Sequence, residues 1–196
     1  MKLKAISLST EKTKLQFDID WKNLGFLLLR GLIFLAFYAL LHFLYDLLPN
    51  PVFQAIAGTN ESVFQHLKIG FFAFLLFIGV DYLFHLKKME NKTAFTFSRL
   101  IGAILVGWLL MFIWYMIPAI YNQEFASLAA ELSLAMVVTY IAGIIAMVFA
   151  ENLEKIEYKL SFKVIIIVLI VILVIFYVVF SFITPWLDVF IDPEFL

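Results

Sequence analysis

The sequence predicts an all-α fold, a polytopic bundle of five transmembrane helices with the N-terminus in the cytoplasm and the C-terminus outside. The 196 residues are 64% hydrophobic and 15% charged, whereas soluble chains are about 45–50% apolar and about 25% charged. The mean hydropathy is +1.02. Five segments reach the length of about 20 mostly apolar residues that a helix needs to cross the hydrocarbon core. Basic and non-basic loops also alternate along the chain.

The first two spans are recognised by their ends. The first covers about residues 23–48, and Pro49 and Pro51 end it because proline cannot continue a helix. The second covers about residues 61–86 and follows Thr59-Asn60-Glu61-Ser62, which offers N-cap side chains and an acidic group suited to the helix dipole. Because the loop between them is short, we expect these two helices to be antiparallel neighbours.

The remaining spans cover about residues 97–120, 124–150 and 163–185. The last of them is almost unbroken Ile, Val, Leu and Phe, so we expect it at the periphery of the bundle, facing lipid. A buried functional helix would more often contain polar groups. The chemistry is therefore expected in the first four spans.

Lys and Arg predict the orientation, because loops on the cytoplasmic side of a membrane have an excess of these residues. An N-terminal arm of residues 1–22 is basic, residues 23–186 form the transmembrane domain, and residues 187–196 form a short acidic external tail. The loops alternate in the same sense. Those at about 87–99 and 151–163 are basic, and those at about 49–60 and 119–125 contain no Lys or Arg.

Ionisable residues inside the spans are candidates for function, because a charge near the bilayer centre costs at least about 2.5–3.5 kcal/mol. At 1.5 Å per residue, His42 and His66 each lie roughly 9 Å inside the outer ends of their helices, and Glu131 roughly 10 Å. Three helices thus place an ionisable group at one level. Asp46 lies one turn outward of His42, and Glu61 lies one turn outward of His66.

The level shared by these groups predicts a site in the outer leaflet. Two imidazoles with carboxylates suit Zn²⁺ or another divalent cation, which could activate a water molecule as a nucleophile. Without a metal, the same groups could relay protons or coordinate a cationic substrate. The predicted metal ligands, which are also the predicted catalytic residues, are His42, Asp46, Glu61 and His66. The predicted substrate-binding residues are Asn60, Ser62, Gln65, Lys68 and Glu131.

Lys68 could pair with Glu131 or Glu61, or bind an anionic headgroup. Near the cytoplasmic side, Asp81 could pair with Arg99 or Arg30, and a structural salt bridge is the favoured interpretation there.

Two stretches, LHFLYD at residues 41–46 and NESVFQHLK at residues 60–68, resemble an uncharacterised family of small prokaryotic polytopic membrane proteins. Its signature is Asn-Glu-Ser-Val-aromatic-Glu-His-Leu-Lys, shortly after a Leu-His-Phe-Leu-Tyr-Asp segment, and the resemblance covers about residues 35–90. Gln65 stands where the family usually has Glu, which removes one candidate acid or metal ligand. The resemblance implies a multi-pass protein of the prokaryotic cell membrane and assigns no activity.

A shorter stretch, SVFQHL at residues 62–67, is similar to an Asn-Ile-Trp-Thr-His-Leu helix start in the superfamily of progestin and adiponectin receptors and alkaline ceramidases. Those seven-helix proteins hold zinc through several histidines, and some hydrolyse lipid amides. The paired late histidines of that superfamily are absent here, because no histidine follows His85. The similarity slightly favours a hydrolase.

Three functions remain open on the sequence. One is a membrane-embedded, metal-dependent hydrolase or transferase acting on a lipid or small amphiphile. Another is a transporter or channel for ions, protons or solutes, which would require a homo-oligomer because five helices enclose little space. The third is a non-catalytic membrane factor whose polar cluster is structural. Membrane lipids and a lipid or small-molecule ligand are the expected partners, while the net charge of −1 predicts no nucleic-acid partner.

Overall fold

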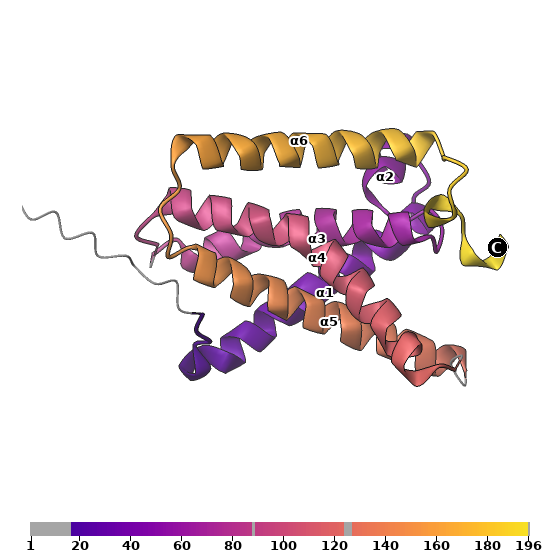
Figure 1. Ribbon diagram of the computed structural model, residues 1–196, viewed down its shortest axis with the longest axis horizontal. Helices are drawn as coiled ribbons and strands as arrows, with labels where there is room; N and C mark the ends of the chain where they lie inside the picture. The colour runs from indigo at the N-terminus through magenta and orange to yellow at the C-terminus, as the bar shows by residue number, and fades with distance from the viewer. Residues whose placement is uncertain (1–16, 88, 124–126, 196) are drawn as a thin grey trace, which may run out of the picture.

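The computed structural model describes residues 17–87, 89–123 and 127–195 (Figure 1). Within them, five helices are long and apolar enough to cross a membrane, and there is no strand, which confirms the predicted all-α polytopic fold. Residues 1–16 of the predicted N-terminal arm lie outside the described residues. The long helices are α1 (Leu24–Leu47), α3 (Val63–His85), α4 (Lys92–Tyr121), α5 (Leu128–Leu153) and α6 (Leu160–Phe182).

A short helix, α2 (Pro51–Ile56), lies in the segment that we expected to be a loop. Asn50 starts it, because the Asn50 side chain accepts hydrogen bonds from the backbone N–H groups of Val52 and Phe53 at 3.0 and 3.1 Å. Pro51 occupies the first helical position, where its missing N–H group costs nothing. The segment after α1 therefore forms a helix of its own, which packs mainly against α6.

Helices α1, α3, α4 and α5 form a four-helix bundle in which α3 contacts α1 and α4, and α5 contacts α4 and α1. The α3–α4 crossing depends on glycine. A Cβ atom added at Gly107 would lie 2.9 Å from the carbonyl oxygen of Leu67, so a larger residue would force the two helices apart. Phe34, Phe74 and Phe77 fill the centre of this bundle and are fully buried.

Helix α6 lies outside this bundle, at the top of Figure 1. Most of its side chains are exposed, which confirms the peripheral position expected for the fifth span. It is joined to α3 by a layer of aromatic rings, with Phe64 packing against Phe176 and Tyr177 at centroid distances of 5.8 Å. The chain then returns through two short 3₁₀ turns, η2 (Asp188–Phe190) and η3 (Pro193–Phe195).

The helices diverge toward the end of the bundle that the basic loops predict to be outside. There, the ends of α4 and α5 that face each other extend to the lower right of Figure 1, away from α2 and the start of α3. In the C-terminal half of α4, the large side chains of Trp108, Phe112 and Tyr115 are exposed.

Candidate functional site

The candidate site lies where α1, the loop before α3, and α3 meet. We call Tyr38, His42, Glu61 and His66 the histidine cluster. The Glu61 Oε2 atom lies 3.6 Å from His42 Nε2 and 3.3 Å from His66 Nε2. On the other side of the His66 ring, Nδ1 lies 3.1 Å from the Tyr38 hydroxyl. Side chains distant in sequence are therefore brought into one polar group between two neighbouring helices.

Helix geometry and a tight loop place these residues. Tyr38 and His42 are four residues apart on α1 and so project from the same face. The loop after α2 passes close to that face, because the Gly58 N–H group donates to the Leu41 carbonyl at 3.0 Å. A Cβ atom at position 58 would lie 3.2 Å from the His42 carbonyl oxygen, so glycine permits this approach. The loop then delivers Glu61 beside the two imidazoles.

The C-terminal tail holds the Glu61 backbone. The Asp192 carboxylate accepts a hydrogen bond from the Glu61 N–H group at 3.0 Å. Phe190, two residues before Asp192 in the tail, is buried and packs against Phe64 at a centroid distance of 4.7 Å. The position of Glu61 therefore depends on the folding of the tail as well as on α1 and α3.

The cluster is open to solvent on one side. The Glu61 side chain is 58% exposed, and the two imidazoles are 21% and 22% exposed. The imidazoles of His42 and His66 beside the carboxylate hold the pKa of Glu61 well below its usual range. An ionised Glu61 that solvent can reach is what a cation-binding site requires.

The spacing of the three ligand-type groups fits one metal ion. His42, Glu61 and His66 each offer one atom, and these atoms lie within 4.8 Å of one another. Two ligands at about 2.0–2.1 Å in a tetrahedral zinc site lie about 3.3 Å apart. The carboxylate already has nearly this spacing to both imidazoles. The two imidazole nitrogen atoms, which lie within 4.8 Å of each other, would have to approach to the same spacing.

The structure does not bring two of the predicted site residues into this cluster. Asp46 is exposed on the last turn of α1 and lies outside the group of atoms that could share an ion. Glu131 lies in the first turn of α5, because this helix begins at Leu128 and not near residue 124. Neither residue forms an ion pair within the described part of the chain.

Lys68 lies elsewhere, between α3, α2 and α6. Its amine is fully buried and donates to the Gln54 carbonyl at 2.9 Å and to the Ser181 hydroxyl at 2.8 Å. Among the described residues it therefore pairs with neither Glu61 nor Glu131. Instead, it joins three helices.

The other predicted substrate-binding residues support the start of α3. The Asn60 side chain accepts a hydrogen bond from the Ser62 N–H group at 3.0 Å. Ser62 is the residue before the helix and is fully buried, and Gln65 is 4% exposed. Neither of these two side chains is open to a ligand from solvent.

Sequence reasoning did not find Tyr38. Its position four residues before His42 was the available signal, because the two side chains must share a face of α1. Tyrosine is also common in membrane spans where it has no functional role, so the spacing alone did not identify Tyr38 as part of the site. Only the approach of His66 from α3 gives the hydroxyl its partner.

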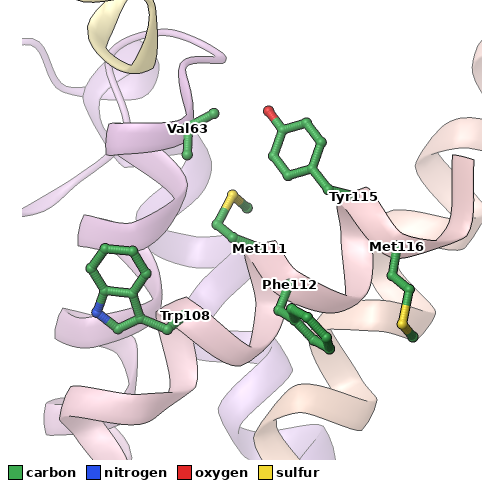
Figure 2. Close-up of a pocket in the computed structure, with 6 residues that line it drawn as sticks. All are labelled: Val63, Trp108, Met111, Phe112, Tyr115 and Met116. Atoms are coloured by element: carbon green, nitrogen blue, oxygen red, sulfur yellow. The ribbon is translucent and has the colours of Figure 1, made fainter. Parts of the chain in front are cut away.

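An apolar hollow lies between the first turn of α3 and the C-terminal half of α4. Figure 2 shows Val63, at the start of α3, and five side chains of the C-terminal half of α4 around this hollow. Its volume is about 520 Å³, and the α4 residues are Trp108, Met111, Phe112, Tyr115 and Met116. Val63 follows Glu61 by two residues and precedes His66 by three. The hollow and the cluster thus share the first turn of α3.

A second polar group, which we call the arginine network, lies at the opposite end of the bundle. Asp81 is fully buried and accepts from Arg30 Nη2 at 2.9 Å and from Arg99 Nε at 3.0 Å, which confirms the predicted pairing. Arg30 also pairs with Glu151, and Arg99 Nη1 lies 3.0 Å from Glu154 Oε2. Four helices are tied together by these ion pairs.

The comparisons with known proteins identify the family without giving an activity. No curated protein and no solved structure matches the chain significantly. The likeness to receptors and ceramidases thus stays a prediction. A family model matches residues 20–194, and the chain belongs to that family, described as a family of unknown function (DUF6512).

Proposed function

We propose that this member of the DUF6512 family is a membrane-embedded, metal-dependent hydrolase or transferase that acts on a lipid or small amphiphile. One observation is central to the proposal: His42, Glu61 and His66, from three separate segments, offer ligand-type atoms within 4.8 Å of one another. These residues would hold Zn²⁺ or a similar divalent cation.

The donor set suits catalysis better than a purely structural site. Structural zinc sites take four protein ligands, whereas catalytic sites take three, including sets of two His and one Glu, and leave a position open. A bound zinc ion would supply a water molecule whose pKa is lowered to about 7. The 58% exposure of Glu61 leaves room for water on that side of the cluster.

Tyr38 supports the metal ligand from behind. When His66 Nε2 is a ligand, its lone pair must point to the ion and the ring must carry its proton on Nδ1. That Nδ1–H group would donate to the Tyr38 oxygen, 3.1 Å away. Metal-binding histidines commonly have such a partner, which fixes the tautomer and the orientation of the ring. In the metal-free protein, the hydroxyl could donate to Nδ1 and the Nε2–H group to Glu61.

The apolar hollow favours an amphiphile as the substrate. It lies on a membrane-spanning helix, is lined by aromatic and thioether side chains, and begins one turn from His66. An acyl chain in this hollow would lie beside the first turn of α3, the turn that also carries His66. The cluster supplies the polar contacts, and the hollow supplies the apolar ones.

The two polar groups of the protein are separated by apolar residues, which does not favour the transporter interpretation. Between Arg30 and Tyr38, α1 contains only apolar side chains and glycine, and so does α3 between Lys68 and Asp81. Phe34, Phe74 and Phe77 fill this region. A path for ions or protons along α1 and α3 would need polar groups or water there.

Metal analysis of the purified protein tests the proposal. After loading with Zn²⁺ and removal of excess metal, we expect about one ion per chain in the wild type, and loss of that ion in His42→Ala and His66→Ala. Asp46→Ala is the matched control, because it removes an exposed ligand-type group one turn from His42 and should retain the metal. Equal metal content in all four proteins, or none in the wild type, would contradict the proposal.

A further inference from the structure

The C-terminal tail, residues 183–195, follows α6 and returns to the start of α3 (Figure 1). Hydrogen bonds inside its two 3₁₀ turns shape it. The Phe190 N–H group donates to the Leu187 carbonyl at 2.9 Å, and the Phe195 N–H group donates to the Asp192 carbonyl at 2.9 Å. The tail therefore has a defined path, although it contains no long helix.

Phe190 anchors this tail in the aromatic layer between α3 and α6. Its side chain is buried and packs against Phe64 of α3 and against Phe180 of α6, at centroid distances of 4.7 and 5.3 Å. Burial of an aromatic ring favours the docked position of the segment that carries it. The tail thus docks at the first turn of α3, which also carries His66.

Both carboxylate oxygens of Asp192 have partners. The Oδ1 atom accepts from the Glu194 N–H group at 3.1 Å, within the tail. The Oδ2 atom accepts from the Glu61 N–H group at 3.0 Å, across 131 residues of sequence. Because the first bond orients the carboxylate, the second bond holds one particular point of the loop before α3.

Glu61 depends on this bond more than the rest of its loop does. The Gly58 N–H group is bonded to α1, and the Ser62 N–H group is bonded to the Asn60 side chain. Within the described residues, the bond to Asp192 is the only hydrogen bond that the Glu61 main chain forms. The Glu61 side chain is also 58% exposed, so packing does little to fix it.

We propose that Asp192 is a positioning residue for the metal site, and that docking of the C-terminal tail and metal binding are coupled. This role rests on the proposed function, because Glu61 acts there as a metal ligand. Asp192 holds the Glu61 main chain so that the Glu61 carboxylate stays between the two imidazoles. The fifth span, outside the four in which we expected the chemistry, thus contributes through the tail that follows it.

Zinc affinities of full-length variants test the hydrogen bond. We expect Asp192→Ala to bind zinc about tenfold more weakly, at the lower end of the 10–100-fold that groups supporting a ligand contribute. Asp192→Asn should retain wild-type affinity, because its amide oxygen can accept the same bond. Asp188→Ala removes an exposed carboxylate of the same tail and is the matched control. In Glu61→Ala protein, Asp192→Ala should have no further effect, because Asp192 acts through Glu61.

Coupling also predicts that zinc protects the tail, because two linked equilibria affect each other equally. The Phe190 and Ile191 N–H groups donate to carbonyls within the tail at 2.9 and 3.0 Å. Bound zinc should slow their hydrogen exchange in the wild type and not in His42→Ala. This measurement leaves the tail unaltered, so it decides the question if Asp192→Ala fails to fold.

Wild-type zinc affinity in Asp192→Ala would overturn the proposal, and so would an equal loss in Asp192→Asn or no protection of the tail by zinc. If the wild type binds no zinc, the proposed function fails, and exchange of the Glu61 amide in metal-free protein tests the positioning separately. This amide should exchange faster in Asp192→Ala than in the wild type. Equal rates would show that Asp192 does not hold Glu61.

Discussion

At the scale of single residues, the position of each side chain in the histidine cluster depends on contacts with its neighbours. Glu61 lies in a loop and stays near the imidazoles because Gly58 fixes the loop before it and Asp192 accepts from its own N–H group. His66 has Tyr38 on one ring nitrogen and Glu61 near the other. Substitutions that remove one hydrogen bond and leave the fold intact are therefore the informative ones.

Tyr38→Phe removes only the hydroxyl partner of His66. We expect zinc affinity to fall about 10–100-fold, because the partners of metal-binding histidines typically contribute that much. Competition with a chromogenic chelator measures the effect. Tyr45→Phe, at a half-buried position on the same helix, is the control and should retain wild-type affinity. Equal affinity in both variants would show that Tyr38 does not support the ligand.

The lowered pKa of Glu61 predicts a pH dependence in metal-free protein. Because the pKa is lower in the folded state, ionised Glu61 stabilises the fold above its ordinary pKa of 4.5. That contribution is lost progressively as the pH falls toward the folded-state value. We expect the difference in melting temperature between wild type and Glu61→Gln, measured with chelator, to shrink below about pH 5. A difference that stays constant from neutral pH to about pH 3 would contradict this.

At the scale of helices, Lys68 fixes the peripheral α6. Its buried amine donates to Ser181 Oγ, and Ser181 in turn donates to the Tyr177 carbonyl at 2.8 Å. This polar contact supplements the aromatic layer between α3 and α6. Lys68, which the sequence assigned to a substrate site, therefore holds a neighbouring helix in place.

Ser181→Ala leaves the buried amine short of one acceptor. We expect a loss of about 1–3 kcal/mol in the free energy of unfolding, the usual cost of an unsatisfied buried group. Denaturant titration in detergent provides the measurement. Ser133→Ala removes a comparable hydroxyl, which donates to the Ala129 carbonyl at 2.7 Å on an exposed face of α5, and should cost little. Similar losses in both variants would indicate only an effect on the helices themselves.

The helices were largely predictable, whereas the site was predictable only in part. Long apolar runs identify membrane spans because the backbone must be satisfied within each helix. His42, Glu61 and His66 were found because two antiparallel neighbours bring equal depths together. Asp46 was wrongly grouped with them because its depth along α1 does not show which part of α1 the following loop contacts. That path depends on α2 and Gly58, which are tertiary features.

Glu131 illustrates a different limit. Its predicted depth depended on a helix starting near residue 124, and a start at Leu128 moves it to the first turn. Apolar residues before a helix look like part of it in a hydropathy pattern. Boundaries of this kind are set by the N-cap, here Ser127, whose hydroxyl accepts from the Ala130 N–H group at 3.3 Å.

At the scale of the whole molecule, the two polar groups lie at opposite ends of the bundle and the basic loops predict which end faces the cytoplasm. The orientation remains a prediction, and the absence of cysteine from the sequence makes it easy to measure. We expect a membrane-impermeant maleimide to label Glu194→Cys in intact cells, and Glu90→Cys only after lysis. Both positions are exposed. The reverse pattern would place the histidine cluster on the cytoplasmic side.

The central claim is that one metal ion is shared by His42, Glu61 and His66. An experimental structure of zinc-loaded protein, with anomalous data at the zinc edge, tests it most directly. The account predicts a single peak at about 2.0–2.2 Å from His42 Nε2, His66 Nε2 and a Glu61 oxygen, with water completing a tetrahedron. No peak between these side chains at saturating zinc, or a peak bound by other residues, would contradict it.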